Sequence, residues 1–425
     1  MPNSNSWDWN IGKRVIADIS EWKKNYEYME ELQVSPDGEK VAAIIKNESA
    51  EFSICENGTL WENTFDKIWQ ARFTPDCRLT ALVSDTGEWT VAVDGEPWEN
   101  RFEFVWDTQF GPDGNDIIVS CQKERRYFAA ANDMPWKENF LSMTNLTVSQ
   151  DGKGLAAVVQ TVPFSEADIS KYQEGCYSVA VDGKAWNRNF VNVWELSFSK
   201  DRRKVAAEVR TSLYDYTIAV DGVCWNQSYP TVWKPVFSPA DGSVTAPVKT
   251  PGGWALARDA KPLWSRSFVQ LWHHMYSADG KNIAAVVAPK FGRWTVAVNE
   301  NPWTLTFGDL ATDAVFSPDG SRVASLGKEN GHWAVVVDGN AWNEKFDMAW
   351  QPVFSPDGRH VAAKVEKNGR HLILVDGRAL KSQFSQVWDP FFSPDGSKLL
   401  VRGIGGDEEQ GKYYRQVLPL TDIIG

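Results

Sequence analysis

Short apolar runs separated by turn residues repeat along the chain, and residues 349–377 show one complete copy. An apolar run meets S-P-D-G at 355–358, a turn composition in which proline fixes φ and glycine accepts a positive φ. A second run follows at 361–365, and after a turn at 367–369 a third run ends in Asp-Gly, a strong hairpin signal. Because consecutive positions are apolar, both faces of these strands are expected to be covered.

The unit recurs about every 39 residues. Its turn aspartate stands at Asp37, Asp76, Asp113, Asp151, Asp201, Asp241, Asp279, Asp319, Asp357 and Asp395. Each third run is followed by an aromatic box, W-x-x-x-F or W-x-x-x-Y, in whose last copy Leu380 replaces tryptophan. The i, i+4 spacing places both aromatic rings on one face of a strand, so the box is interpreted as a fourth strand. Four antiparallel strands per unit predict one β-propeller blade, and the fold class is all-β.

The turn F-S-P-D-G followed by V-A-A, as at 354–363, resembles the WD40-like PD40 repeat of the TolB-type propellers. The copies cover nearly the whole chain, so the resemblance implies a propeller fold. It implies little about function. The chain differs from TolB-like proteins because no export signal and no separate domain precede the repeats.

The two ends of the chain predict how the repeats close. Residues 15–26 have the pattern of a closing half-unit, and residues 388–420 have the pattern of an opening half-unit. Pairing of these segments would leave no sheet edge unpaired. We therefore expect ten blades in one closed ring over residues 11–425, preceded by a mobile leader at 1–10. Ten exceeds the usual range of about four to eight blades, so two smaller propellers in tandem stay open as the alternative.

Charge and composition limit the classes of partner that the chain is expected to bind. The chain has 56 Asp and Glu against 44 Lys and Arg, which gives a net charge of -12. This charge argues against sequence-independent binding to the phosphates of nucleic acid. It has no apolar run of about 18 residues that could span a bilayer, and its first ten residues lack a secretory signal. A cytoplasmic protein without a membrane span is expected. Most of the 22 tryptophans fall on repeat positions, where packing between blades accounts for them.

The sequence offers no catalytic motif. Its five cysteines lie at least 22 residues apart, and the neighbouring His273 and His274 should point to opposite faces of a strand. The turn aspartates are expected to bond the backbone of their own turns. We expect no catalytic residue, no cofactor and no metal. An enzyme, or a binder of small molecules or glycans that uses a central channel, remains the alternative, because residues about 39 apart could converge there.

The segments that break the repeat are the candidates for function. They are the insertion at 160–175, the loop at 210–216, the acidic and glycine-rich segment at 403–412 and the leader. Exposed aromatic side chains are frequent at protein interfaces, so partner binding is assigned to the aromatic residues of these segments. These residues are Trp7, Trp9, Phe164, Tyr172 and Tyr214.

A tryptophan-rich, acidic propeller of this length without a signal also resembles the tryptophan-rich cytoplasmic subunit (TmcD) family of the transmembrane redox complex of sulfate-reducing bacteria. The resemblance rests on the overall pattern. It implies partners that carry haem in a periplasmic cytochrome, iron–sulfur clusters in a heterodisulfide-reductase-like subunit, and a membrane cytochrome b. The expected function is a non-catalytic scaffold subunit of a cytoplasm-facing, membrane-associated electron-transfer complex, held at the inner face of the membrane by its protein partners.

Overall fold

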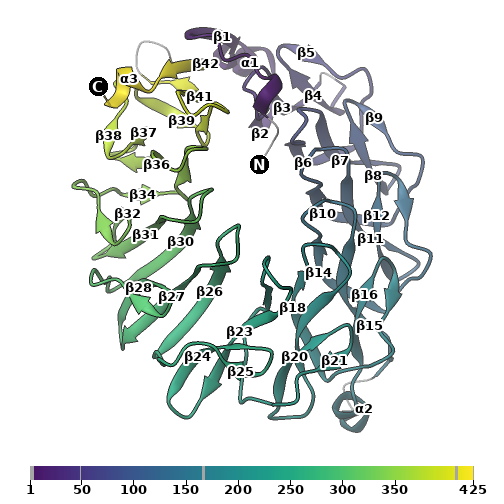
Figure 1. Cartoon of the computed structure of the whole chain (residues 1–425). Coiled ribbons are helices and arrows are strands. Elements are labelled where there is room, and N and C mark those ends of the chain that lie inside the picture. Colours follow the sequence, from purple (N-terminus) through teal and green to yellow (C-terminus); the bar gives the residue numbers. More distant parts are fainter. Residues whose placement is uncertain (1–3, 48, 165–167, 407–409, 425) are drawn as a thin grey trace. The chain divides into compact units, whose positions relative to one another are not determined.

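The computed structural model describes residues 4–47, 49–164, 168–406 and 410–424 (Figure 1). Strands make up most of these residues, which confirms the all-β prediction. The helices are short: η1 (Ser4–Ser6), α1 (Ile19–Asn25), α2 (Ile169–Glu174) and α3 (Thr421–Ile424). Within the described part of the chain, no helix is long and apolar enough to cross a membrane.

The chain divides into two compact units. The first comprises Met1–Thr86, Ala92–Pro97 and Ser277–Gly425, and the second comprises Gly87–Val91 and Trp98–Tyr276. Both are built from antiparallel sheets, and in the four-stranded sheets the strands follow one another in chain order, whereas the ten-stranded sheet places β1 beside β42. The predicted four-stranded antiparallel sheets are thereby confirmed for many of the repeats, whereas the number of blades and the closure of one ring remain predictions.

The second unit contains four complete four-stranded sheets. Their strands are β10 (Phe104–Phe110), β11 (Ile117–Lys123), β12 (Arg126–Ala131) and β13 (Met134–Pro135); β14 (Ser142–Val148), β15 (Leu155–Gln160), β16 (Tyr177–Val181) and β17 (Lys184–Ala185); β18 (Asn192–Phe198), β19 (Val205–Arg210), β20 (Tyr216–Val220) and β21 (Val223–Cys224); β22 (Val236–Phe237), β23 (Val244–Thr250), β24 (Gly253–Arg258) and β25 (Lys261–Pro262). Strand β26 (Gln270–Tyr276) ends this unit.

The first unit contains two complete four-stranded sheets, a ten-stranded sheet and further strands. The four-stranded sheets are β2 (Met29–Val34), β3 (Val41–Lys46), β4 (Phe52–Glu56) and β5 (Thr59–Leu60); β30 (Leu310–Phe316), β31 (Val323–Glu329), β32 (His332–Val337) and β33 (Asn340–Ala341). The ten-stranded sheet holds β1 (Gly12–Asp18), β34 (Met348–Ala349), β35 (Val353–Phe354), β36 (Val361–Lys367), β37 (Arg370–Val375), β38 (Arg378–Ala379), β39 (Phe384–Val387), β40 (Phe391–Phe392), β41 (Lys398–Gly405) and β42 (Lys412–Pro419). The further strands are β6 (Lys67–Phe73), β7 (Leu79–Asp85), β9 (Glu96–Pro97), β27 (Ile283–Lys290), β28 (Arg293–Val298) and β29 (Asn301–Pro302), while β8 (Glu88–Val93) is divided between the units.

The aromatic box is not the fourth strand that its spacing predicted. The fourth strand is the residue pair before the tryptophan, as in β33. The Trp342 amide still donates to the Val335 carbonyl oxygen at 2.8 Å, and Phe346 exchanges two backbone hydrogen bonds of 2.9 and 2.8 Å with Trp333, at the start of the third strand. The Trp342 side chain covers the next Asp-Gly turn, where a Cβ on Gly377 would lie 3.4 Å from its Cγ.

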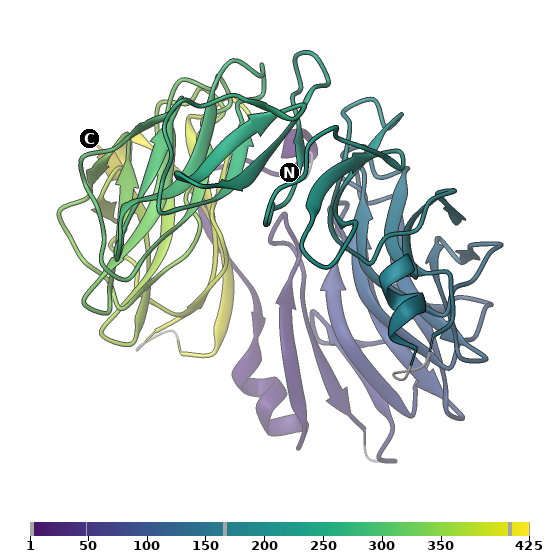
Figure 2. The same ribbon diagram turned by 90° about the horizontal axis from the view of Figure 1, so that it is seen from below.

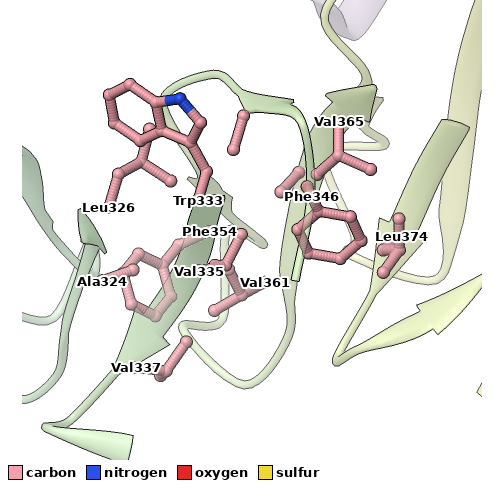
Figure 3. Packing of buried hydrophobic residues seen from close by; sticks show 12 residues of the cluster. Ala324, Leu326, Trp333, Val335, Val337, Phe346, Phe354, Val361, Val365 and Leu374 are labelled. Atoms are coloured by element: carbon pink, nitrogen blue, oxygen red, sulfur yellow. The ribbon is translucent and has the colours of Figure 1, made fainter. Parts of the chain in front are cut away.

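The core lies between the faces of successive sheets. Figure 3 shows one cluster, in which Phe346 and Trp333 meet side chains of β31, β32 and β36. Phe346 is 1 % exposed, whereas Trp342 of the same box is half-buried. The expectation that tryptophans fill the space between blades is therefore met only in part, because the box phenylalanines lie deeper.

The N-terminal strand joins the C-terminal strands inside the first unit. Strand β1 pairs antiparallel with β42, with Gly12 opposite Val417, and β42 pairs with β41. The segment predicted as a strand over 15–26 ends its strand at Asp18 and continues as α1, which Figure 2 shows in purple. Asp18 starts this helix because its carboxylate accepts a 3.0 Å hydrogen bond from the Ser20 amide.

Two buried arginines tie the C-terminal strands to the first turn of the repeat. Arg402 and Arg415 donate to carbonyl oxygens of residues 35–39 at 2.8 and 2.7 Å. The Tyr413 hydroxyl donates to the Gly38 carbonyl at 3.0 Å. Buried arginine needs such partners because an unpaired buried charge is strongly destabilising. These polar contacts add to an apolar cluster at the same seam, in which Ile404 and Tyr413 pack with Val34 and Val41.

Candidate interaction surface

The connections between the second and third strands differ between blades. In sheet β30–β33 this connection is a tight Asn330-Gly331 turn with positive φ at both residues. In the adjacent sheets β14–β17 and β18–β21 it is longer and spans residues 161–176 and 211–215. These two connections coincide with the segments that break the sequence repeat.

The longer loop is built around helix α2. Asp168 accepts a hydrogen bond from the Lys171 amide at the start of this helix. Phe164 packs on Tyr172 with ring centroids 5.6 Å apart and on Tyr177 at 6.3 Å. The Tyr172 hydroxyl donates to Asn192 of the next sheet. Phe164 and Tyr172 are therefore brought together as half-buried residues that fix the loop.

The shorter loop is held by its own polar groups. The Arg210 guanidinium donates to the carbonyl oxygens of Ser212 and Leu213 at 3.1 and 2.5 Å, and the Ser212 hydroxyl donates to Asp215 at 2.5 Å. Tyr214, at the tip, is 82 % exposed. The structure thus holds the Tyr214 side chain in solvent on a constrained loop.

The two loops form one surface. Tyr172 bonds Asn192, which pairs with Arg210 in the β18–β19 ladder, and Arg210 holds the second loop. Two further apolar residues are exposed here, Ile169 at 63 % and Leu213 at 41 %. We name this the loop-edge surface. It consists of Phe164, Ile169, Tyr172, Leu213 and Tyr214.

Ile169 and Leu213 were missed by the sequence analysis, which considered aromatic residues alone. Their only sequence signal is that an aliphatic residue stands inside a segment that breaks the repeat. Residues 165–167 of the same insertion lie outside the described residues.

Trp7 and Trp9 belong to the first unit. Their rings stack with centroids 6.1 Å apart, and Trp7 also meets Phe391 edge-on at 5.2 Å. The Lys398 ammonium donates to the Trp9 carbonyl oxygen at 3.0 Å. Both tryptophans are half-buried, so residues 4–10 pack along β40 and β41.

Glu208 and His274 are buried titratable side chains of the second unit, and the sequence analysis considered His274 but not Glu208. Glu208 of β19 is 5 % exposed, and burial, assisted by the nearby Glu195 charge, raises the pKa of its carboxyl to about 8. His274 of β26 is also buried, with Nε2 2.8 Å from the Thr245 hydroxyl, and burial lowers its pKa to about 4. Its neighbour His273 is exposed, as expected for adjacent strand residues.

The turn aspartates bond their own turns, as the sequence indicated. Asp319 accepts hydrogen bonds from the Ser317 hydroxyl at 2.5 Å and from the Ser321 amide at 3.1 Å, and these bonds lower its pKa to about 2. The same pattern recurs at Asp357 and Asp395. In the portion of the chain that the structure describes, no group of three or more His, Cys, Asp or Glu side chains is placed to hold a metal ion.

Comparison with known proteins gives distant structural likenesses. No protein-family model and no curated protein matches the chain. The solved structures it resembles include a eukaryotic initiation factor, at 13 % identity over 81 % of this chain and 99 % of that chain, with a TM-score of 0.48. The Dos1 propeller follows at 13 % identity over 97 % and 95 %, with a TM-score of 0.40. TolB from Acinetobacter baumannii shows 16 % identity over 74 % and 78 %, with a TM-score of 0.29. These likenesses are too distant to assign a function.

Proposed function

We propose that this chain is a non-catalytic interaction subunit, a propeller scaffold that presents the loop-edge surface to a partner protein. The observation that carries the proposal is the 82 % exposed Tyr214, with Ile169 and Leu213 exposed on the same loops. Aromatic side chains anchor interfaces because they bury a large apolar area and lose few rotamers. The repeated sheets supply the rigid support for these side chains.

Contacts within the chain hold Tyr172 and the loop that carries Tyr214 in place without a partner. Arg210 fixes the loop below Tyr214, and the Tyr172 hydroxyl ties the α2 loop to the neighbouring sheet. A surface that is already ordered loses less conformational entropy on binding. This arrangement supports recognition by a preformed surface.

The positions of the titratable groups support a non-catalytic role. His274 is buried and bonded to Thr245, and turn aspartates such as Asp319 are engaged by their own turns. General acid–base catalysis requires a group within hydrogen-bond reach of a substrate. The loop-edge surface itself carries aromatic and aliphatic side chains.

The setting we propose is a membrane-associated electron-transfer complex on the cytoplasmic side. Its support is the sequence resemblance to the tryptophan-rich subunit family together with the net charge of -12. In that setting the partners would carry haem and iron–sulfur clusters, and this chain would position them. Charge complementarity would accelerate docking more than it would tighten the complex.

Affinity purification from gently solubilised membranes of the native host tests this function. We expect the tagged chain to be colourless when isolated and to recover haem- and iron-containing proteins from membranes. The double variant Ile169→Ser/Tyr214→Ser should lose roughly tenfold or more of this recovery, because hot-spot residues dominate binding energy. Phe291→Ser is the matched control, since Phe291 is 92 % exposed in the corresponding β27–β28 turn of the first unit.

Two results would contradict the proposal. One is full recovery of partners by the double variant. The other is a native protein in the soluble fraction that converts a small molecule without partners, which would favour the channel-using enzyme instead.

A further inference from the structure

A groove of about 470 Å³ lies between sheets β14–β17 and β18–β21 in the second unit. Its walls are residues 181–188, residues 202–205 and the turn at 221–223. Because successive strands are antiparallel, these turns lie at the strand ends opposite the loop-edge surface. The groove is therefore a separate feature from the proposed interaction surface.

Four cations line this groove in an otherwise acidic chain: Lys184, Arg188, Arg202 and Arg203. One carboxylate, Asp221, also contributes a negative charge to the lining and accepts a 2.9 Å hydrogen bond from the Val205 amide, so the lining carries more cations than anions. Arg202 Nε lies 2.7 Å from Asp151, and Arg203 Nε lies 3.7 Å from Asp201 with most of its side chain in solvent. Several donors thus remain available to an anionic ligand.

The next groove along the unit has the same construction and the opposite charge. It has a volume of about 590 Å³ and lies between sheets β18–β21 and β22–β25. Asp221, Asp241 and Asp259 line it, with Lys204 as its basic residue. Grooves therefore form between successive sheets of the repeat, whereas the basic lining is found in the first of these two grooves. We call that one the 181–223 groove.

The turn that carries Arg202 and Arg203 departs from the repeat, and this departure has a cost in backbone conformational energy. Where most other copies have proline and glycine, this turn has Lys200 and Arg202, followed by Arg203 and Lys204. Arg202 adopts φ 60°, in the left-handed region where Gly152 and most other copies carry glycine; Cys77, at φ 68°, is the other exception. That conformation is disfavoured for a residue with a Cβ. An exposed ion pair such as that with Asp151 contributes little in return, so structural stability alone does not account for Arg202.

The floor of the groove is apolar. Trp186 is half-buried on the ring of Phe190, with centroids 6.4 Å apart, and lies beside Ala185 and the exposed Val223. The Arg188 guanidinium lies 5.2 Å from the Phe190 ring centroid. A ligand that fits this groove combines carboxylates with an apolar side chain.

We propose that the 181–223 groove binds a short acidic peptide segment of a partner protein, with an apolar residue of that segment on Trp186. Charge complementarity selects the acidic peptide, and the small groove limits its length. Nucleic acid is disfavoured because the net charge of -12 and the neighbouring acidic groove repel an extended polyanion. The proposal goes beyond the loop-edge surface and does not depend on it.

Fluorescence anisotropy of the full chain tests the groove. The probe is a fluorescein-labelled peptide of glutamates around one leucine, and the same peptide with glutamines is the comparison. We expect the glutamate peptide to bind with an affinity that falls as the salt concentration is raised. The glutamine peptide should bind with an affinity lower by roughly tenfold or more. Absence of binding by the glutamate peptide at low salt would overturn the proposal.

Charge reversal localises the binding. The double variant Lys184→Glu/Arg203→Glu should lower the affinity for the glutamate peptide by roughly tenfold or more. The neutral double variant Lys184→Gln/Arg203→Gln should lower this affinity less. The control is Lys281→Glu, because Lys281 occupies the same turn position as Arg203, is mostly exposed and pairs with Asp279 at 3.1 Å. An equal loss in the control, or tighter binding of a single-stranded oligonucleotide than of the peptide, would contradict the assignment.

Arg202→Gly separates binding from structure, since it restores the residue that other copies of the turn carry. We expect unchanged or higher thermal stability and a several-fold weaker peptide affinity. A purely structural role for Arg202 predicts the reverse, with lower stability and unchanged binding.

Discussion

Sheet β30–β33 and strands β34–β38 of the ten-stranded sheet follow the repeat at their turns, whereas sheets β14–β17 and β18–β21 break the repeat at three turns. The breaks are the α2 insertion, the loop that carries Tyr214 and the turn that carries Arg202. Both pairs of sheets keep the same deep core, since Phe346 and Phe190 are both buried. The comparison teaches that the repeated positions maintain packing and that the departures create the surface chemistry.

One departure also reaches the interior. The fourth residue of the second strand is Leu326 in sheet β30–β33, whereas in sheet β18–β21 it is Glu208. Both side chains are buried. Sheet β18–β21 therefore buries a titratable group where sheet β30–β33 buries an aliphatic one. In β36 the same position holds Lys364, which is partly buried and pairs with Asp389 at 2.9 Å.

The largest expected effect tests the shared core. Phe346→Ala and Phe190→Ala should each lower the free energy of unfolding by about 3 to 5 kcal/mol, because each leaves a cavity between two sheets. Urea denaturation measures both. A much smaller effect in either variant would show that the two pairs of sheets are not packed alike.

The second prediction concerns Glu208 and pH. Its folded pKa of about 8 lies above the unfolded value, so the unfolded state releases the proton first as pH rises, and stability falls between about pH 4.5 and 8. Glu208→Gln should match the native protein at pH 4.5 and exceed it by about 2 to 4 kcal/mol at pH 8.

The measurement is thermal unfolding across this pH range. Glu344→Gln serves as the control, because Glu344 is exposed and pairs with Lys367 at 2.9 Å. A difference between Glu208→Gln and the native protein that does not change with pH would contradict the buried, protonated carboxyl.

A third, smaller effect separates the two aromatic residues of one box. Trp342→Ala should lower the free energy of unfolding by about 1 to 3 kcal/mol, less than Phe346→Ala, because Trp342 is half-buried over the Gly377 turn. Denaturation of the two variants side by side checks the order. A larger loss of unfolding free energy in Trp342→Ala than in Phe346→Ala would show that the tryptophan is the principal core residue of the box.

The smallest stability effect is expected at the loop-edge surface. Tyr214→Ser should change the free energy of unfolding by no more than about 0.5 kcal/mol, as for other exposed positions, while partner recovery falls. Melting curves and affinity purification of the same preparation provide both values. A clear loss of stability would mean that Tyr214 packs within its own chain.

The strands and turns could be predicted from the sequence because their signals are local. The S-P-D-G and Asp-Gly turns determine where each hairpin reverses, and the apolar runs lie between them. The aromatic box was misassigned because its spacing does not reveal where backbone pairing ends. Helix α1 was missed although Asp18 and Glu21 form the acidic N-terminal pattern of a helix start.

The surface was predicted less completely than the fold. Phe164, Tyr172 and Tyr214 follow from the broken repeat, but the exposure of Ile169 and Leu213 depends on how each loop folds back. Arg202 had a usable signal, because most aligned copies have glycine at its position, whereas the position of Glu208 varies between copies and holds Lys364 in one of them. Their burial and backbone conformation required the structure.

Photo-crosslinking from position 214 tests the central claim most directly. A benzophenone amino acid at Tyr214 places a reactive group at the tip of the loop-edge surface, and the same residue at Phe291 provides an equally exposed control in the first unit. In native membranes we predict a covalent adduct with a haem- or iron-containing partner from position 214 and none from position 291. An adduct from position 291 alone, or from neither position while the partners still co-purify, would contradict the claim that this surface binds them.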